Sequence, residues 1–225
     1  MPSKNTLKIY IKDGYYHIYN RGVAKQKIFL DSQDFKVFLK YLKESLGKPV
    51  VKKIFFTLQG QSFKGMPRPV KNFHKNIDFI AFCLMPNHFH FLIKQVDEKN
   101  IESFMRSLIT RYSRYFNKKY ERVGHVFQGR YKAALITEDN YLLHLTRYIH
   151  LNPSEYVKDI TRAYSSYGDY IGLRKTPWIK PDFIIKFFSH KTLPELTIKK
   201  INDYKRFVEN YQKDSKQVLG ELTLE

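Results

Sequence analysis

The sequence predicts an α+β fold, and three observations support this prediction. Short segments rich in β-forming residues alternate with longer segments whose apolar residues recur at helical spacing. These segments follow one another in the order βαββαβα. After about residue 168 the chain changes to short segments interrupted by proline, with two further helical patterns. Because 43% of the 225 residues are hydrophobic, the chain is long enough and apolar enough to bury a core.

The first predicted strand covers residues 15–20, with the sequence YYHIYN, and closes at a turn that begins with Arg21. A helix follows between Asp31 and Gly47, where apolar residues have helical spacing. Asp31 or Ser32 is the expected N-cap, and Gly47 ends the helix.

Residues 58–76 are expected to form a basic loop or insertion, because they contain two glycines, two prolines, four Lys or Arg and no acidic residue. Two strands come next, IDFIAFCLM over residues 77–85 and HFHFLIKQ over residues 88–95. Pro86 and Asn87 separate them as a turn, so this pair is predicted to be a hairpin.

A second helix is predicted over residues 100–120, followed by a strand over residues 131–137. A third helix opens near Asp139 and must stop before Pro153, because proline cannot continue the helical hydrogen bonds and disfavours αR geometry at Asn152. The resulting βαββαβ core is typical of a ferredoxin-like antiparallel sheet with helices on one face.

We divide the chain into residues 1–168, which hold this core, and residues 169–225, a helical C-terminal extension. The extension has helical patterns around residues 182–188 and 197–212. Because fold alone does not assign a function, the functional prediction depends on composition and motifs.

The composition points to an anionic partner. Forty Lys and Arg outnumber 21 Asp and Glu, which gives a formal net charge of +19, and nucleic acid is the first candidate. The sequence has no run of about 18 apolar residues and no signal-peptide core, so we expect a soluble, cytoplasmic protein with no membrane partner. The single cysteine, Cys83, excludes a disulfide framework and a cysteine-based zinc cluster.

The predicted strand after Asn87 carries two histidines one residue apart. Side chains alternate along a strand, so His88 and His90 share one face while Phe89 and Phe91 share the other. The phenylalanines can pack against helices, which leaves the imidazoles on an open face where they could bind a divalent metal. The alternative is that they are two surface polar residues.

The third predicted helix carries a second group of polar residues. Tyr148 and Asn152 are four residues apart and therefore lie on one face, with His144 a turn below. An amide oxygen could supply a third metal ligand beside a phenol. The alternative is that Tyr148 packs against the sheet and Asn152 only caps the helix.

Four segments together resemble a known family: YHIYNRGVAKQKIF, FCLMPNHFHFLI, GHVFQGRYKA and TRYIHLNP. They look like the REP-associated tyrosine transposases, within the single-tyrosine HUH transposases, over about residues 15–168. The resemblance implies that His88 and His90 are metal ligands, that Asn152 is the third ligand, and that Tyr148 is the nucleophile. Family members use Mg²⁺ or Mn²⁺ and cut single-stranded DNA beside a hairpin in repetitive palindromic elements, forming a 5′-phosphotyrosine link and a free 3′-hydroxyl.

A tyrosine needs assistance to act as this nucleophile. A phenol with a pKa of about 10 is only about 0.1% ionised at pH 7, a deficit of roughly 4 kcal/mol. A divalent metal that polarises the scissile phosphate offers several kcal/mol. No general base is evident; His144 is near in helical register and is at most an accessory residue that contacts DNA or packs.

The stretch from Arg106 to Lys132 contains eight Lys or Arg against one acid, with interleaved tyrosines. Cations beside aromatic rings are typical of single-strand or hairpin DNA binding; the alternative is a solvated helix face. The predicted DNA contacts are Arg21, Arg111, Arg114, Lys118, Lys119, Arg122, Arg130 and Lys132.

Two other functions stay open on the sequence. A domesticated, non-cleaving protein that binds hairpin or single-stranded DNA would keep the fold and the charge, and a hydrolytic enzyme would use the His pair for zinc. The sequence is compatible with a monomer and with a homodimer whose active sites are shared between chains.

Overall fold

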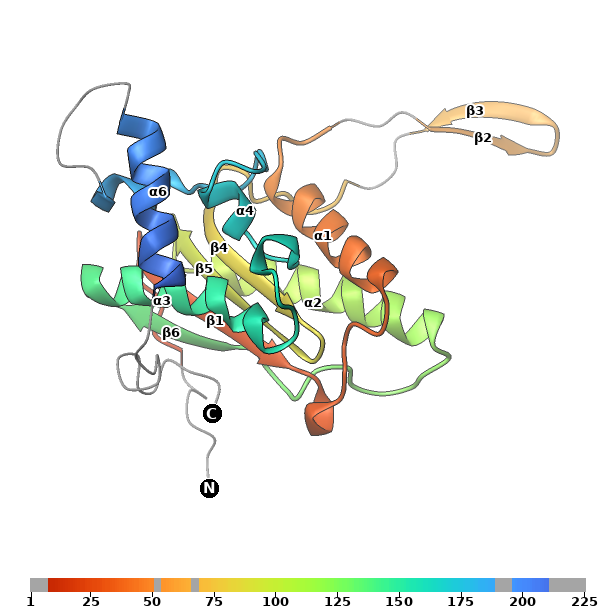
Figure 1. Ribbon diagram of the computed structural model, residues 1–225. Helices are drawn as coiled ribbons and strands as arrows, with labels where there is room; N and C mark the ends of the chain where they lie inside the picture. The colour runs from red at the N-terminus through yellow and green to blue at the C-terminus, as the bar shows by residue number, and fades with distance from the viewer. Residues whose placement is uncertain (1–7, 51–53, 66–68, 189–195, 211–225) are drawn as a thin grey trace.

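A four-stranded antiparallel sheet forms the centre of the molecule (Figure 1). The computed structural model describes residues 8–50, 54–65, 69–188 and 196–210. The strands lie in the order β4-β5-β1-β6, with bounds Tyr15–Arg21 for β1, Ile77–Met85 for β4, His88–Gln95 for β5 and Lys132–Ile136 for β6. With one helix after β1 and one after β5, this is the predicted ferredoxin-like βαββαβ arrangement, which is confirmed.

Helices α1 (Ser32–Leu46) and α2 (Asn100–Lys119) pack on the phenylalanine face of the sheet. The ring of Phe38 on α1 lies 5.7 Å from that of Phe89 and 6.2 Å from that of Phe91, measured between centroids. Of the two expected caps of α1, the structure has Asp31, whose carboxylate accepts hydrogen bonds from two backbone N–H groups of the first turn. The sequence-based assignment of this face to the core is therefore confirmed.

Helix α3 (Asp139–Leu151) covers the opposite face, where the two histidines lie. His90 is fully buried there, so the expectation of an open imidazole face was wrong. The reason is that this face also carries Cys83 and Leu92, which need cover as much as the phenylalanines do. The apolar stripe of α3, including Leu145 and Ile149, supplies that cover.

The end of α3 differs from the prediction in one respect. The α-helix stops at Leu151, before Pro153, as expected. Asn152 nevertheless has αR geometry (φ −48°, ψ −41°) and begins a 3-10 turn that runs to Glu155. Proline is tolerated in the first turn of a helix because its missing N–H is not needed there. Asn152 thus stays one helical turn beyond Tyr148, and its N–H donates to the Tyr148 carbonyl.

The insertion contains more structure than the expected basic loop. Strands β2 (Ile54–Leu58) and β3 (Gln61–Gly65) pair in a separate two-stranded sheet, so the loop prediction was wrong over residues 61–65. Gln59 and Gly60 both have positive φ and form the two-residue turn between the strands. The glycine that indicated a loop is thus the turn of a hairpin, which projects away from the body of the molecule beyond α1 (Figure 1).

The C-terminal region packs on the core through short elements. These are α4 (Tyr167–Tyr170), α5 (Asp182–Ile185), α6 (Leu196–Glu209) and short 3-10 segments at Ile160–Arg162 and Lys186–Phe188. A further 3-10 segment, Val23–Lys25, follows β1. Both predicted helical patterns of the extension are observed, although residues 211–212 lie outside the described residues. Trp178 packs on Phe79 and Phe82 with ring centroids 5.6 and 5.7 Å away. The boundary after residue 168 stays a prediction. Within the described ranges, no helix is both long and apolar enough to cross a bilayer.

His150 connects α3 to two neighbouring elements. Its Nδ1 lies 2.6 Å from the hydroxyl of Tyr204 on α6, and its Nε2 lies 2.7 Å from the hydroxyl of Ser166. Ser166 in turn accepts a hydrogen bond of 2.9 Å from the backbone N–H of Phe82 on β4. The histidine of the TRYIHLNP segment therefore fixes the position of α3 relative to the sheet and to α6.

The buried His150 predicts a specific pH dependence of stability. Burial, with a smaller contribution from Arg174, lowers the pKa of His150 to about 3, while an unfolded histidine has a pKa of about 6.5. Between these values the unfolded chain binds a proton that the folded chain does not. The contribution of His150 is thus fully present above pH 6.5 and is lost as the pH falls, by about 1.4 kcal/mol per pH unit.

Urea denaturation at pH 7 and pH 5 measures this effect. His150→Gln should be less stable than the parent at pH 7, but its free energy of unfolding should fall by about 2 kcal/mol less on going to pH 5. An identical pH dependence in the two proteins would show that His150 is not held neutral by the fold.

Candidate metal and nucleophile site

Two elements that are distant in sequence meet at the start of β5. Strand pairing places Arg21 of β1 opposite His88, and Tyr19 opposite His90. The last turn of α3 brings Tyr148 over the same strands, and Asn152 follows directly. The structure therefore brings together all four residues that the motifs singled out as ligands and nucleophile.

His88 has an oxygen near each ring nitrogen. Asn87 Oδ1 lies 2.6 Å from Nδ1, and Asn152 Oδ1 lies 3.2 Å from Nε2. Burial lowers the pKa of His88 to about 4; the bond to Asn152 opposes this shift and Arg21 adds to it. The ring is therefore neutral at pH 7 and has a single N–H, which cannot donate to both oxygens.

The closer oxygen, that of Asn87, is the better acceptor for this N–H, which leaves the lone pair of His88 Nε2 facing the oxygen of Asn152. A cation between these two atoms satisfies both of them. Two ligands in neighbouring octahedral positions about 2.1 Å from a metal are about 3 Å apart, close to the 3.2 Å observed. The donor pair thus fits a divalent cation without rearrangement.

His90 is oriented by a second buried histidine, His17 of β1. Its Nδ1 lies 2.9 Å from His17 Nε2, and the two rings are stacked with centroids 5.1 Å apart. Burial lowers the pKa of His90 well below its usual value, and the neighbouring His17 and His88 add to this effect, so this ring is neutral. Within the described residues, His90 Nε2 is buried and has no hydrogen-bond partner. Such an orphaned nitrogen is expected of a metal ligand whose other ring nitrogen is held by a second group.

His17 was not predicted from the sequence. Its strand was recognised, and alternation along YYHIYN places it on the same face as Tyr19. That signal does not show that this face adjoins His90, because the pairing register of β1 with β5 is a tertiary property.

Tyr148 lies against the imidazoles and is half-buried. Its ring meets that of His90 edge-on with centroids 5.3 Å apart, and that of His17 with centroids 6.3 Å apart. Among the described residues no group of three His, Cys, Asp or Glu could hold a metal. A site at this position therefore needs an amide ligand, and imidazole nitrogens with an amide oxygen suit Mn²⁺ or Mg²⁺ in an open coordination sphere.

Two of the predicted DNA-binding cations lie on the histidine face. Arg21 Nε donates to Gln128 Oε1 at 2.6 Å, which holds the guanidinium beside His88. Lys132 of β6 pairs with Tyr19 in register, and its ammonium lies 5.8 Å from the centroid of the Tyr19 ring. Arg130, just before β6, is exposed.

The cations of α2 lie on the other side of the sheet. Arg111 forms an ion pair with Glu44 and stacks on the Tyr41 ring at 4.1 Å. Lys119 bridges Asp31 at 2.7 Å and the buried Asp34 at 2.8 Å. Three other predicted contacts are placed as follows: Arg114 and Lys118 are exposed on α2, and Arg122 donates to Gln26 Oε1 at 3.2 Å.

The predicted accessory residue His144 contacts the C-terminal region. It hydrogen-bonds to Arg147, and its ring centroid lies 6.3 Å from that of Phe207 on α6. The Arg147 guanidinium stacks on the same Phe207 ring at 4.4 Å. These contacts place His144 in the packing between α3 and α6.

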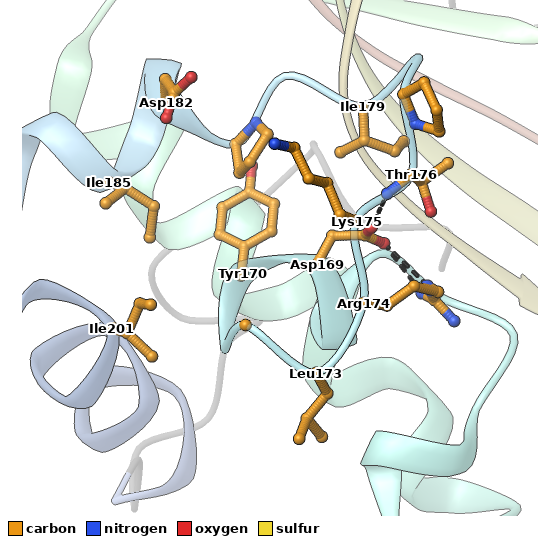
Figure 2. Close-up of a pocket in the computed structure, with 13 residues that line it drawn as sticks. Asp169, Tyr170, Leu173, Arg174, Lys175, Thr176, Ile179, Asp182, Ile185 and Ile201 are labelled. Carbon is orange, nitrogen blue, oxygen red and sulfur yellow. Dashed lines mark hydrogen bonds and ion pairs between the residues drawn. The ribbon is translucent and has the colours of Figure 1, made fainter. Parts of the chain in front are cut away.

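A cavity of about 630 Å³ lies between α4, α5 and α6 (Figure 2). The carboxylate of Asp169 on its wall accepts hydrogen bonds from Arg174 Nε at 3.1 Å and from the backbone N–H of Thr176 at 2.6 Å. Leu173 and Ile201 contribute apolar surface. None of the motif residues lines this cavity, so it is separate from the histidine site.

One protein family matches part of the chain. Residues 52–152 match the family described as "Transposase IS200 like". This part of the chain is thus similar to IS200-like transposases, and the family resemblance seen in the sequence motifs is confirmed. The match spans the histidine pair, Tyr148 and Asn152.

A solved structure shares the fold of this chain. It is described as "Structure of the REP associates tyrosine transposase bound to a REP hairpin"; it covers 79% of this chain and 91% of that chain, with 15% identity and a TM-score of 0.50. Another is a putative transposase from Deinococcus radiodurans R1, covering 66% of this chain and 95% of that chain, with 13% identity and a TM-score of 0.35, which is too low to carry an argument. No curated protein matches the chain.

The contact between His17 and His90 leads to a prediction about metal affinity. His17→Leu should weaken Mn²⁺ binding about 10- to 100-fold, because His90 loses the partner that holds its tautomer and ring orientation. His17→Gln, whose amide oxygen can take the place of Nε2, should restore part of the affinity. Titration of Mn²⁺ followed by electron paramagnetic resonance measures both variants.

The matched control is His74→Leu, which removes a half-buried imidazole that hydrogen-bonds to the Leu46 carbonyl far from the site. This control should bind Mn²⁺ like the parent. Parental affinity in His17→Leu would contradict the assigned role of His17.

Proposed function

We propose that this protein is a metal-dependent single-stranded DNA endonuclease and strand transferase that acts beside DNA hairpins through a 5′-phosphotyrosine intermediate. One observation carries the proposal: α3 places Tyr148 against the ring of His90 and Asn152 against His88 in the same chain. The match of residues 52–152 to IS200-like transposases supports it. So does the fold shared with a transposase described as bound to a REP hairpin.

Tyr148 supplies the nucleophile. Its phenolic oxygen forms a bond to the phosphorus of the scissile phosphodiester, and the bond from phosphorus to the 3′-oxygen breaks. The phenol loses one proton and the departing 3′-oxygen gains one, so the step needs no further reactant. The step replaces one phosphoester bond by another. The 3′-hydroxyl of another strand can therefore attack the phosphotyrosine, reverse the step and rejoin DNA.

His88, His90 and Asn152 would hold Mg²⁺ or Mn²⁺. When bound, the cation polarises the scissile phosphate and offsets the charge on its oxygens, worth several kcal/mol. His17 and Asn87 orient the two imidazoles from behind. Arg21, held beside His88 by Gln128, is placed to bind a neighbouring phosphate of the strand.

The contact between Tyr148 and His90 of the same chain supports a site assembled within one chain. Cleavage by a monomer would then require no tyrosine from a second copy. This arrangement also argues against a purely DNA-binding role, which has no use for a phenol placed against two neutral imidazoles.

The central prediction concerns a covalent adduct. With Mn²⁺ and a single-stranded substrate that contains a hairpin, the parent should form a protein–DNA adduct that survives a denaturing gel, and Tyr148→Phe should form none. His88→Ala and His90→Ala should also lose the adduct yet bind DNA within about threefold of the parent, because phosphate contacts carry affinity.

The outcomes distinguish the alternatives. A parent that binds the hairpin but forms no adduct would support the non-cleaving DNA-binding protein. Release of a free 5′-phosphate with no adduct would support a hydrolytic enzyme that uses the His pair for zinc. Equal loss of DNA binding in the histidine variants would contradict the separation of chemistry from affinity.

The salt dependence of binding tests the electrostatic part of the proposal. If six to ten phosphates are neutralised, affinity for hairpin DNA should fall about 10³- to 10⁵-fold between about 50 and 200 mM salt. Lys132→Gln should lower the slope of log K against log salt by about 1.

The matched control is Lys119→Gln. Because Lys119 is already paired with Asp31 and Asp34, its loss should reduce protein stability and leave the salt slope unchanged. A flat salt response in the parent would remove the electrostatic account of DNA binding.

A further inference from the structure

The β2–β3 hairpin, residues Ile54–Gly65, is called the arm below. It forms its own two-stranded sheet, separate from the four-stranded sheet of the core, and it projects beyond α1 (Figure 1). A two-stranded hairpin by itself is marginally stable in water. An arm that packs on so little of its own protein is expected to gain order from a partner.

The arm belongs to the most one-sidedly charged part of the chain. Residues 45–77 include seven Lys or Arg and no Asp or Glu. Lys64 lies on the arm itself, and the exposed Lys71 follows it. In a chain that already has a net charge of +19, this surface repels a second copy and attracts a polyanion.

Both faces of the arm expose apolar side chains. Phe55 is 74% exposed, and it lies opposite Lys64 on one face. Leu58 and Phe63, 63% and 42% exposed, share the other face. The exposed parts of these side chains give both faces apolar surface.

We propose that the arm binds duplex DNA, namely the stem of the hairpin beside which the protein acts; this rests on the proposed function. A two-stranded ribbon has the width of the major groove, where Lys64 of the arm would meet a phosphate and the apolar side chains would meet base edges. Single-stranded DNA instead requires a groove whose aromatic rings stack successive bases. The described side chains of the arm instead expose apolar surface on both faces of a two-stranded ribbon.

The arm lies at the far end of the sheet from the histidines. It connects through residues 66–76 to the first residue of β4, whereas His88 pairs with Met85, the last residue of that strand. Nine residues of β-strand span about 30 Å, which corresponds to about nine base pairs of duplex at about 3.4 Å each. A stem shorter than this cannot reach the arm while its end lies at the active site.

The test uses stem length as its variable. Two substrates share one single-stranded flank and carry stems of about 6 and about 20 base pairs. The first variant combines Phe55→Ser, Phe63→Ser and Lys64→Glu, and the second replaces residues 55–64 by a short Gly-Ser turn. Equilibrium binding is measured without metal, and adduct formation is measured separately with Mn²⁺.

The parent is expected to bind the long stem about tenfold more tightly than the short one, and both arm variants should lose this advantage. Binding to the short stem should change less than about twofold, and the adduct should form on it as in the parent. The matched control is Lys205→Glu, a charge reversal at an exposed position of α6, which should keep the preference for the long stem.

Unchanged binding of the long stem by the arm variants would overturn the proposal. Equal loss on both stems would also overturn it, because the arm would then contact the single strand. A change in oligomeric state without a change in stem binding would assign the arm to protein association instead. The parent could also form no adduct while the arm variants still lose the preference for the long stem. That result would support duplex binding by the arm and refute the proposed cleavage function.

Discussion

The packing of α3 onto the histidine face of the sheet is the interaction on which the candidate chemistry depends. This helix places Tyr148 and Asn152 one turn apart over His90 and His88. His150, from the same short segment, anchors the helix through hydrogen bonds toward β4 and α6. The residues that would react and the residue that holds them in place are therefore neighbours on one helix, and the geometry of the site depends on the stability of its packing.

Burial gives this site its electrostatic character. His88 and His90 are kept neutral, as the lowered pKa values of both side chains indicate, and a neutral imidazole is the form that binds a metal. His17 and Asn87 occupy the nitrogens that point away from the site. Burying a neutral imidazole costs less free energy than burying an ionised carboxylate. This difference explains why the polar residues of this otherwise apolar strand are histidines.

The large positive charge of the chain is divided among different roles. On α2, Arg111 and Lys119 pair with carboxylates of the neighbouring α1 region and tie the two together. On the histidine face, Arg21 lies beside His88, and Lys132 lies beside Tyr19, one strand farther from the candidate ligands. The arm adds Lys64, and the exposed Lys71 follows it along the chain. A charge count predicts an anionic partner, but the ion pairs show that only part of that charge is available to it.

The sequence by itself determined the order of the strands and helices of the core, the shared face of His88 and His90, and the spacing of Tyr148 and Asn152. These features follow from local periodicity, which each segment carries regardless of its neighbours. Only the tertiary structure decided that His17 supports His90, that α3 covers the imidazoles, and that Lys119 bridges acidic residues. Strand register and helix docking decide such contacts, because they join residues tens of positions apart that no local pattern relates.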